Sequence, residues 1–475
     1  ILFVEGLEMT NTVPFKCGLE ATSTSYDIQD ALEVTRVEDY DFTLHPIVLN
    51  GEWLGAEVRE SISAASALER FSKSARKSDE TLAASDWSYS VVGTVTSDVD
   101  KLNSQEEKER IAAEEGMHEQ ISWAGHLGLS SVMVQCPAGN VGNFARHIYR
   151  TLLSLHAMKI VVRVNLGSTS EEAESSWKNF SLIRSLCDHS SLLFVALEIG
   201  EDLPGDEVLA RWMSEPVYAL IFPTSTFTRN KKNFPCLTKK HQDLVIRGLR
   251  HEYHFIISGE RWPGEDNYLV YAQYLSYLSN KSPIFTTEEE YEKPYFDYLQ
   301  MPLQPLQDHL ESNTYEVFEK DPVKYQEYEN AVREALVDKY RQKDKVTIMV
   351  VGAGRGPLVE CSMRAALAAE KKIKLYAVEK NPNAIKTLTY LQKRRWGSDV
   401  ELVFCDMRDF CPDEKADILV SELLGSFGDN ELSPECLDGA QRFLADDGIS
   451  IPSSYTSFLS PLSSSKLYQG VQAFG

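Results

Sequence analysis

The chain has 475 residues, of which 43% are hydrophobic, and at about 150 residues per domain it should fold into two or three compact units. This apolar content excludes a disordered tail protein. The 48 Lys and Arg residues against 71 Asp and Glu residues give a net charge of −23, which leaves no basic surplus for sequence-independent binding of nucleic acid.

Apolar runs and cysteine spacing predict a soluble protein of the cytoplasm and nucleus. The longest unbroken apolar runs, such as Leu192 to Leu197 and Val217 to Phe222, have six residues, whereas a membrane span needs about 20. The eight cysteines include no C-x-x-C pair, which is typical of reduced thiols, and we predict no metal site. The chain starts at Ile1 without a signal segment and stops abruptly at Gly475, so we expect it to be trimmed at both ends.

The first half of the chain alternates short β-branched runs with helical stretches, a pattern typical of βα units. Eight such units in about 260 residues match a (β/α)₈ barrel, so we predict a TIM-like barrel domain over residues 1–275. An open doubly wound sheet is the alternative, because periodicity does not separate the two. The predicted strands are Val13–Cys17, Phe42–Val48, Val91–Val95, Val132–Gln135, Ile160–Leu166, Phe194–Ile199, Ala219–Pro223 and His254–Ile257.

A proline-rich segment follows, and we interpret residues 276–313 as an interdomain linker because its prolines exclude one long helix. Asp321 and Pro322 then supply a cap and a favoured first residue for a helix over Tyr325–Lys339. A second βα series predicts a Rossmann-like domain over residues 314–455. Its expected strands are Val346–Val351, Lys374–Val378, Glu401–Phe404 and Asp417–Ser421.

The first strand of this series runs into a glycine-rich turn, Gly352-Ala-Gly354-Arg-Gly356, which opens the next helix. Glycine lets the backbone turn tightly and lets a ligand approach without a Cβ in the way. A dinucleotide site would need a third glycine where Pro357 stands, so the spacing favours a ligand without a pyrophosphate. For a single glycine-rich loop, a plain βα turn is the commoner explanation.

Carboxylates stand at the ends of the next two strands. Glu379 ends the second strand, where an acid accepts hydrogen bonds from ribose hydroxyls in nucleoside-binding Rossmann folds. Asp406 and Met407 follow the third strand, where an adenine edge and face would lie. Each carboxylate by itself would more often be a helix cap or a surface charge, but the ordered series predicts a site for an adenosyl group.

The fourth strand leads into a loop bracketed by Glu422 and Glu431, with Gly425 and Gly428 between them. The glycines allow the loop to fold back and aim both carboxylates into one cleft. Paired carboxylates bind a metal ion, act as the acid and base of a glycosidase, or bind a cationic substrate. We favour a guanidinium, whose planar fork of donors matches two carboxylates. A helix cap is the structural alternative for Glu431. A lysine that neutralised either carboxylate would remove the grip on the cation.

At these residues the sequence resembles the protein arginine methyltransferases, and within them the symmetric-dimethylating, type II members. The resemblance is carried by Thr314–Pro322, Gly352–Gly356, Tyr376–Asn383 and Ser421–Ala440. It implies transfer of methyl groups from S-adenosylmethionine to arginines of Arg/Gly-rich proteins and histone tails, which forms monomethylarginine and symmetric dimethylarginine.

Site roles follow from the same resemblance. Glu422 and Glu431 would be the catalytic residues. Phe318, where asymmetric-dimethylating relatives have Met, would direct the second methyl to the other nitrogen and so set the product. The cofactor-binding residues would be Tyr315, Lys324, Tyr325, Gly352, Gly354, Glu379, Asp406 and Met407.

The resemblance also implies a C-terminal β-barrel, which we expect to be largely absent because only residues 456–475 would enter it. We therefore expect this fragment to be weakly active or inactive. A homo-oligomer and a WD-repeat adaptor are implied, with no nucleic acid or membrane as direct partner. The sequence leaves three alternatives: an NAD-type oxidoreductase, which Pro357 disfavours, a non-catalytic scaffold, and a nucleoside-binding protein.

Overall fold

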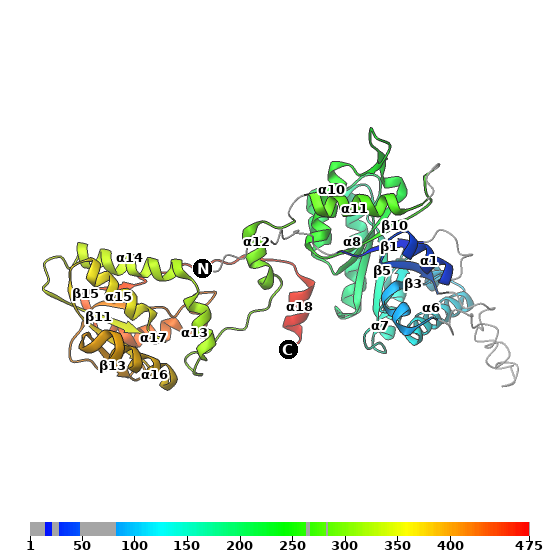
Figure 1. The fold of residues 1–475 in the computed structure, drawn as a ribbon. Helices are drawn as coiled ribbons and strands as arrows, with labels where there is room; N and C mark the ends of the chain where they lie inside the picture. The colour runs from blue at the N-terminus through cyan, green and yellow to red at the C-terminus, as the bar shows by residue number, and fades with distance from the viewer. Residues whose placement is uncertain (1–14, 21–27, 48–81, 263–266, 282–283, 475) are drawn as a thin grey trace. The chain divides into compact units, whose positions relative to one another are not determined.

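The computed structural model describes residues 15–20, 28–47, 82–262, 267–281 and 284–474 (Figure 1). The chain forms two compact units, one made of Ile1–Leu299 with Leu462–Gly475 and the other of Gln300–Pro461. In the described part of the chain, no helix combines the length and the apolar character needed to cross a membrane. The domain limits drawn from the sequence stay predictions.

The first unit contains a closed barrel of eight parallel strands, as predicted, and not an open sheet. The barrel closes where the first strand pairs with the last, for example Gly18 with Ile256. On its other side Gly18 pairs with Phe42, and a Cβ on Gly18 would lie 2.2 Å from the Phe42 ring, so glycine is needed at this position. The strands, in the order in which they pair around the barrel, are β1 (Cys17–Glu20), β10 (His254–Ser258), β7 (Val217–Pro223), β6 (Leu193–Glu198), β5 (Lys159–Asn165), β4 (Ser131–Gln135), β3 (Val91–Thr94) and β2 (Phe42–Pro46).

The predicted first strand, Val13–Cys17, was wrong in its position. Val13 and Pro14 lie outside the described residues, and the strand begins at Cys17, whose backbone N–H donates to Asp41 Oδ2 at 2.7 Å. The other seven strands lie where they were predicted, with ends shifted by two residues at most.

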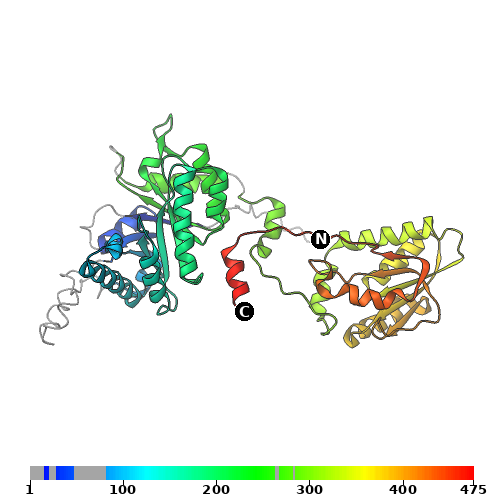
Figure 2. The same ribbon diagram turned by 180° about the vertical axis from the view of Figure 1, so that it is seen from behind.

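Helices surround the barrel on its outside, as both views of this unit show (Figures 1 and 2). Several have regular N-caps; for example, the Thr169 hydroxyl accepts from the N–H of Glu172 in a capping box. The helices of this unit are α1 (Ile28–Val37), α5 (Ala84–Ser90), α6 (Glu107–Leu127), α7 (Gly142–Leu152), α8 (Ser170–Leu186), α9 (Asp206–Met213), α10 (Lys239–Arg250), α11 (Leu269–Lys281), α12 (Thr287–Glu292) and α18 (Ser465–Gln472).

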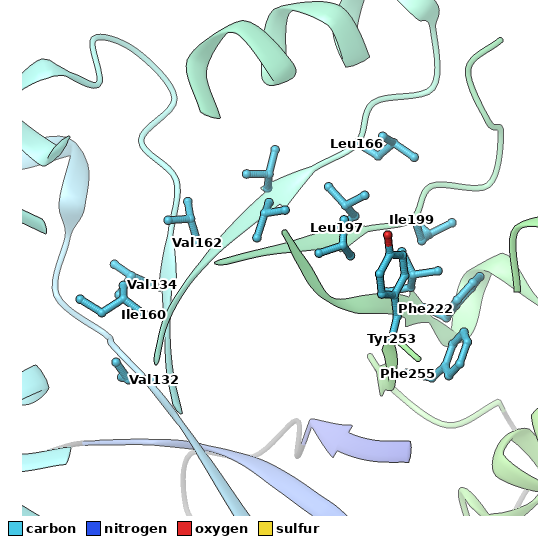
Figure 3. Packing of buried hydrophobic residues seen from close by; sticks show 14 of the residues in the cluster. Val132, Val134, Ile160, Val162, Leu166, Leu197, Ile199, Phe222, Tyr253 and Phe255 are labelled. Atoms are coloured by element: carbon cyan, nitrogen blue, oxygen red, sulfur yellow. The ribbon is translucent and has the colours of Figure 1, made fainter. Parts of the chain in front are cut away.

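The barrel strands alternate between two buried faces. Val132, Ile160 and Phe255 belong to the larger cluster, which packs between the strands and the surrounding helices (Figure 3). Their neighbours Met133 and Val161 belong to a second cluster that fills the barrel interior. Successive side chains on a strand point to opposite faces, so a strand that is buried on both faces has a continuous apolar run in its sequence. This explains why the eight strands were recognisable in the sequence.

The second unit is a five-stranded parallel sheet with flanking helices. As predicted, Asp321 caps the helix that begins at Pro322, and its carboxylate accepts from Lys324 N–H at 3.0 Å. In pairing order the strands are β13 (Val400–Phe404), β12 (Lys372–Glu379), β11 (Lys345–Val351), β14 (Ala416–Ser421) and β15 (Leu444–Ile451). The helices are α13 (Ser312–Glu319), α14 (Pro322–Asp338), α15 (Pro357–Ala368), α16 (Pro382–Leu391) and α17 (Ser433–Gln441).

The sequence did not predict β15, the edge strand of this sheet. Its middle, Asp446-Asp447-Gly448, is polar and carries a glycine, so the segment lacks the apolar run of a central strand. The pairing with β14 is also irregular between Ala416 and Ile418. An edge strand needs only partial burial, which its composition does not reveal.

Candidate functional site

A pocket of the second unit lies at the carboxyl ends of β11, β12, β13 and β14. In parallel sheets these ends meet at one edge, where ligands bind. The structure brings all eleven predicted site residues to the lining of this pocket: Tyr315, Phe318, Lys324, Tyr325, Gly352, Gly354, Glu379, Asp406, Met407, Glu422 and Glu431.

Glu379 is buried, with 6% of its surface exposed, and is held by the backbone around it. Its Oε2 accepts from the N–H of Gly354 at 2.7 Å, and its Oε1 accepts from the N–H of Asn381 at 2.7 Å. A carboxylate offers about four acceptor positions, so about two are left for the hydroxyls of a ligand. The residue is thus fixed in place and still able to bind.

The glycine-rich turn runs close beneath neighbouring side chains. Gly352 and Gly354 have φ of 74° and 53°, in the left-handed region that favours glycine. A Cβ would lie 2.8 Å from Leu423 Cδ2 at Gly352 and 3.1 Å from Tyr315 Cε1 at Gly354. The turn therefore forms a cradle that any larger residue would fill.

Asp406 lines the pocket but already has a strong partner in Arg408. The Nε and Nη2 of Arg408 donate to the two carboxylate oxygens at 3.0 and 2.8 Å, and the backbone N–H of Arg408 donates at 2.9 Å. These hydrogen bonds hold the pKa of the Asp406 carboxyl below its usual value. The carboxylate is thus oriented by Arg408, with the Met407 side chain beside it in the lining.

The loop between Glu422 and Glu431 folds back on itself, as its glycines predicted. Gly425 and Gly428 exchange backbone hydrogen bonds of 3.0 and 2.9 Å, and the side-chain Oδ1 of Asn430 accepts from Phe427 N–H at 2.9 Å. Helix α17 begins at Ser433 without any side-chain cap. The alternative that Glu431 is a helix cap was therefore wrong.

The two glutamates act electrostatically on each other across the pocket. Burial, and then the negative charge of Glu422, raise the pKa of the Glu431 carboxyl. Within the described part of the chain, no side chain donates a hydrogen bond to the Glu431 carboxylate. Glu422 has a cation nearby, because Lys324 Nζ lies 3.5 Å from its Oε2. The same ammonium lies 5.0 Å from the ring centre of Tyr325 and 5.6 Å from that of Phe318.

We expect Glu431→Gln to raise the melting temperature at pH 7.5 and to have little effect near pH 4. A raised carboxyl pKa means that the folded chain holds the proton more tightly than the unfolded chain, so this group favours folding at low pH. That contribution is lost as the pH rises through the raised pKa. Thermal unfolding of both proteins across this pH range checks it, and a variant that is less stable at pH 7.5 would contradict it.

Sequence reasoning missed several residues that build the pocket wall. Arg355 joins the glycine-rich turn to α13 through Glu319 at 3.2 Å and Ser312 O at 3.0 Å. Lys380 Nζ donates to Leu306 O at 2.6 Å, so part of the segment interpreted as a linker lines the pocket. The position of Arg355 inside the turn was a usable signal, whereas residues near Leu306 carry no motif.

The pocket lining combines carboxylates, glycines and aromatic rings. Among the described residues, no group of three or more His, Cys, Asp or Glu side chains is arranged to hold a metal ion. The arrangement suits a ligand with hydroxyl groups at Glu379 and a cation between Glu422 and Glu431.

Comparisons with known proteins match both units. The model of the PRMT5 TIM barrel domain matches residues 39–281, and that of the PRMT5 arginine-N-methyltransferase matches residues 286–451. Protein arginine N-methyltransferase 5 of Xenopus laevis is 47% identical over 84% of this chain and 66% of its own length. The protein of the same name from Oryza sativa subsp. japonica is 42% identical, over 83% of this chain and 67% of its own length.

The chain therefore spans about two thirds of the length of these curated relatives. Among solved structures, the crystal structure of Arabidopsis thaliana protein arginine methyltransferase 10 is 25% identical, with a TM-score of 0.22. It covers 26% of this chain and 34% of that chain.

Proposed function

Because the chain belongs to the protein arginine N-methyltransferase 5 family, we propose that it transfers methyl groups from S-adenosylmethionine to arginine side chains of proteins. One observation carries the proposal. Glu422 and Glu431 line the same pocket as the glycine-rich turn and the buried carboxylate of Glu379. A site for a guanidinium and a site for an adenosyl group are thus continuous.

The pocket residues fit S-adenosylmethionine, which supplies an electrophilic methyl group when it is bound. Glu379 retains acceptor positions for ribose hydroxyls, and the turn at Gly352 and Gly354 has the room that a missing Cβ leaves. Asp406 and Met407 would bind the adenine. Tyr315 and Tyr325 would cover the ligand from α13 and α14.

The paired glutamates make the arginine reactive. The pKa of an arginine side chain exceeds about 12, so its nitrogens are poor nucleophiles at neutral pH. Glu422 and Glu431 draw the positive charge toward one nitrogen and leave more lone-pair density on the other. Glu431, whose pKa is raised by burial and by the Glu422 charge, can accept the released proton. Fixed orientation and low dielectric strengthen these effects.

Monomethylarginine and symmetric dimethylarginine are the proposed products, and Arg/Gly-rich proteins and histone tails are the proposed substrates. The net charge of −23 supports a basic substrate through electrostatic steering. By resemblance to the family, we also propose that the protein forms a homo-oligomer, binds a WD-repeat adaptor and is located in the cytoplasm and nucleus. Light scattering of the purified protein tests the oligomer.

Phe318→Met is expected to shift the product toward asymmetric dimethylarginine. The Phe318 ring lines the pocket beside the Lys324 ammonium, and a slimmer side chain gives the already methylated nitrogen room to face the donor again. A roughly tenfold change in the ratio of the two products corresponds to ~1.4 kcal/mol between two transition states. Fragmentation mass spectrometry separates the products by the amine that each loses.

Val317→Met is the matched control, because Val317 lies next in the same helix and is exposed. It should leave the product ratio unchanged. An unaltered ratio in Phe318→Met would mean that this ring does not set the product.

The function is tested with an Arg/Gly-rich peptide and S-adenosylmethionine that carries an isotopically labelled methyl. We expect label on arginine in low yield, in keeping with the weak activity expected of this chain, with the two methyls of the dimethylated product on separate nitrogens. A thermal-shift comparison of S-adenosylmethionine with NAD should show stabilisation by the first alone. Stabilisation by NAD with no label on arginine would refute the proposal.

A further inference from the structure

Lys324 stands out among the cations of the pocket because it faces a carboxylate with a proposed catalytic role. Its Nζ lies 3.5 Å from Glu422 Oε2, near the outer limit of a hydrogen bond, and the two side chains are 26% and 24% exposed. The rings of Tyr325 and Phe318 flank the same ammonium. A carboxylate between aromatic rings is a good site for a cation, and Lys324 now occupies it.

The other cations that line the pocket are held more firmly. Arg355 has two partners, Glu319 at 3.2 Å and Ser312 O at 3.0 Å. Lys380 Nζ donates to Leu306 O at 2.6 Å. Lys324 has the longest contact of the three and a flexible four-carbon stem, so it changes partner most easily.

This contact places a positive charge where the substrate guanidinium has to bind. Glu422 is one half of the pair that grips the guanidinium, and an ammonium against Oε2 occupies one face of that carboxylate and offsets its charge. A guanidinium that enters must therefore displace Lys324. A ligand that offers Lys324 another anion removes the obstacle.

We propose that Lys324 masks Glu422 in the cofactor-free protein, and that the carboxylate of S-adenosylmethionine draws the lysine away and so opens the arginine site. This inference rests on the proposed function and adds an order of binding to it. Lys324 acts here as a positioning residue, because it works through Glu422. To release Lys324 from Glu422, the pocket must receive another anionic group that the lysine can contact. The carboxylate at the methionine end of the cofactor supplies this group.

Calorimetric titration of the 475-residue chain tests the mask without any turnover. The titrant is an Arg/Gly-rich peptide, and S-adenosylhomocysteine stands in for the cofactor because it keeps the carboxylate but has no methyl to transfer. We expect S-adenosylhomocysteine to tighten binding of the peptide about tenfold, within the usual range of coupling between sites. 5′-Methylthioadenosine, which keeps the nucleoside but lacks the carboxylate, should leave peptide affinity unchanged.

Lys324→Met should remove the dependence of peptide affinity on S-adenosylhomocysteine. Without any cofactor analogue, it should bind the peptide as tightly as the unaltered protein does with S-adenosylhomocysteine, and the analogue should add nothing. Lys320→Met is the matched control, because Lys320 lies four residues earlier, at the end of α13, with 69% of its side chain exposed, and does not line the pocket. It should keep the tenfold dependence. Lys324→Gln provides a second neutral variant with the same expected result, should the Met variant unfold.

The outcomes separate this inference from the proposed function. The mask would be overturned if peptide affinity in a neutral Lys324 variant still depended on S-adenosylhomocysteine. It would also be overturned if, in the absence of any analogue, this variant bound the peptide no more tightly than the unaltered protein. An equal response of the unaltered protein to both analogues would also overturn it. If the unaltered protein with S-adenosylhomocysteine bound a citrulline version of the peptide as well as the arginine version, the proposed function itself would fail.

Discussion

Glu422→Gln is expected to lower the rate of methyl transfer at least about 10²-fold, the usual cost of removing one electrostatic contact to a developing charge. Glutamine keeps the shape of the side chain but loses the negative charge that polarises the guanidinium. Glu431 would then be the one remaining carboxylate of the pair, and its own pKa would move toward the usual value once the Glu422 charge is gone. Transfer of labelled methyl to an Arg/Gly-rich peptide at saturating S-adenosylmethionine measures the loss.

Glu435→Gln is the matched control for this variant. Glu435 lies in the first turn of α17, four residues beyond Glu431, is exposed and does not line the pocket. Its replacement should change the rate less than twofold, roughly within the scatter of surface substitutions. Binding of S-adenosylhomocysteine should be unchanged in the Glu435→Gln control and no weaker in Glu422→Gln, which no longer holds Lys324 at a charged carboxylate. A Glu422→Gln protein with the rate of the Glu435→Gln control would show that the pair does not act on the arginine.

Glu379→Gln is expected to weaken binding of S-adenosylhomocysteine about 10²-fold and to lower the free energy of unfolding by ~2–3 kcal/mol, because charge-assisted hydrogen bonds are lost in a buried place. Both carboxylate oxygens accept backbone N–H groups at 2.7 Å, from Gly354 and from Asn381. The amide of glutamine has one acceptor oxygen, so its NH₂ group would face one of these donors. The glycine-rich turn would lose an anchor on one side.

Calorimetric titration measures the first effect and unfolding in urea the second. Glu401→Gln is the control, since Glu401 lies on the neighbouring strand β13 with 57% of its side chain exposed and only a 3.8 Å contact to Lys374. It should bind S-adenosylhomocysteine as the unaltered chain does. If Glu379→Gln kept full affinity and stability, the ribose role assigned to Glu379 would be wrong.

Much of the architecture was readable because its signals are local. The barrel strands were recognisable because burial on both faces requires an unbroken apolar run, as in Val217–Pro223. The glycine-rich turn and Glu379 were recognisable because each directly follows or ends such a strand. Parallel strands then bring their carboxyl ends to one edge, so motifs on four separate strands predicted one pocket.

Other features depend on partners that lie far away in the sequence. Lys324 and Glu422 are 98 residues apart, and Arg355 reaches Ser312 over 43 residues. The segment around Leu306 lines the pocket although its proline-rich composition indicated only a linker. No spacing rule links such residues, because the folded backbone rather than their order in the chain determines whether they meet.

The sequence by itself determined which chemical groups this protein has at its strand ends, because strand periodicity and glycine turns are properties of neighbouring residues. Only the tertiary structure decided how those groups are paired: Asp406 with Arg408, Arg355 with Glu319, and Lys324 with Glu422. Such pairing depends on distances of a few ångströms between side chains, and a charge changes its behaviour with the partner and the burial that the fold provides.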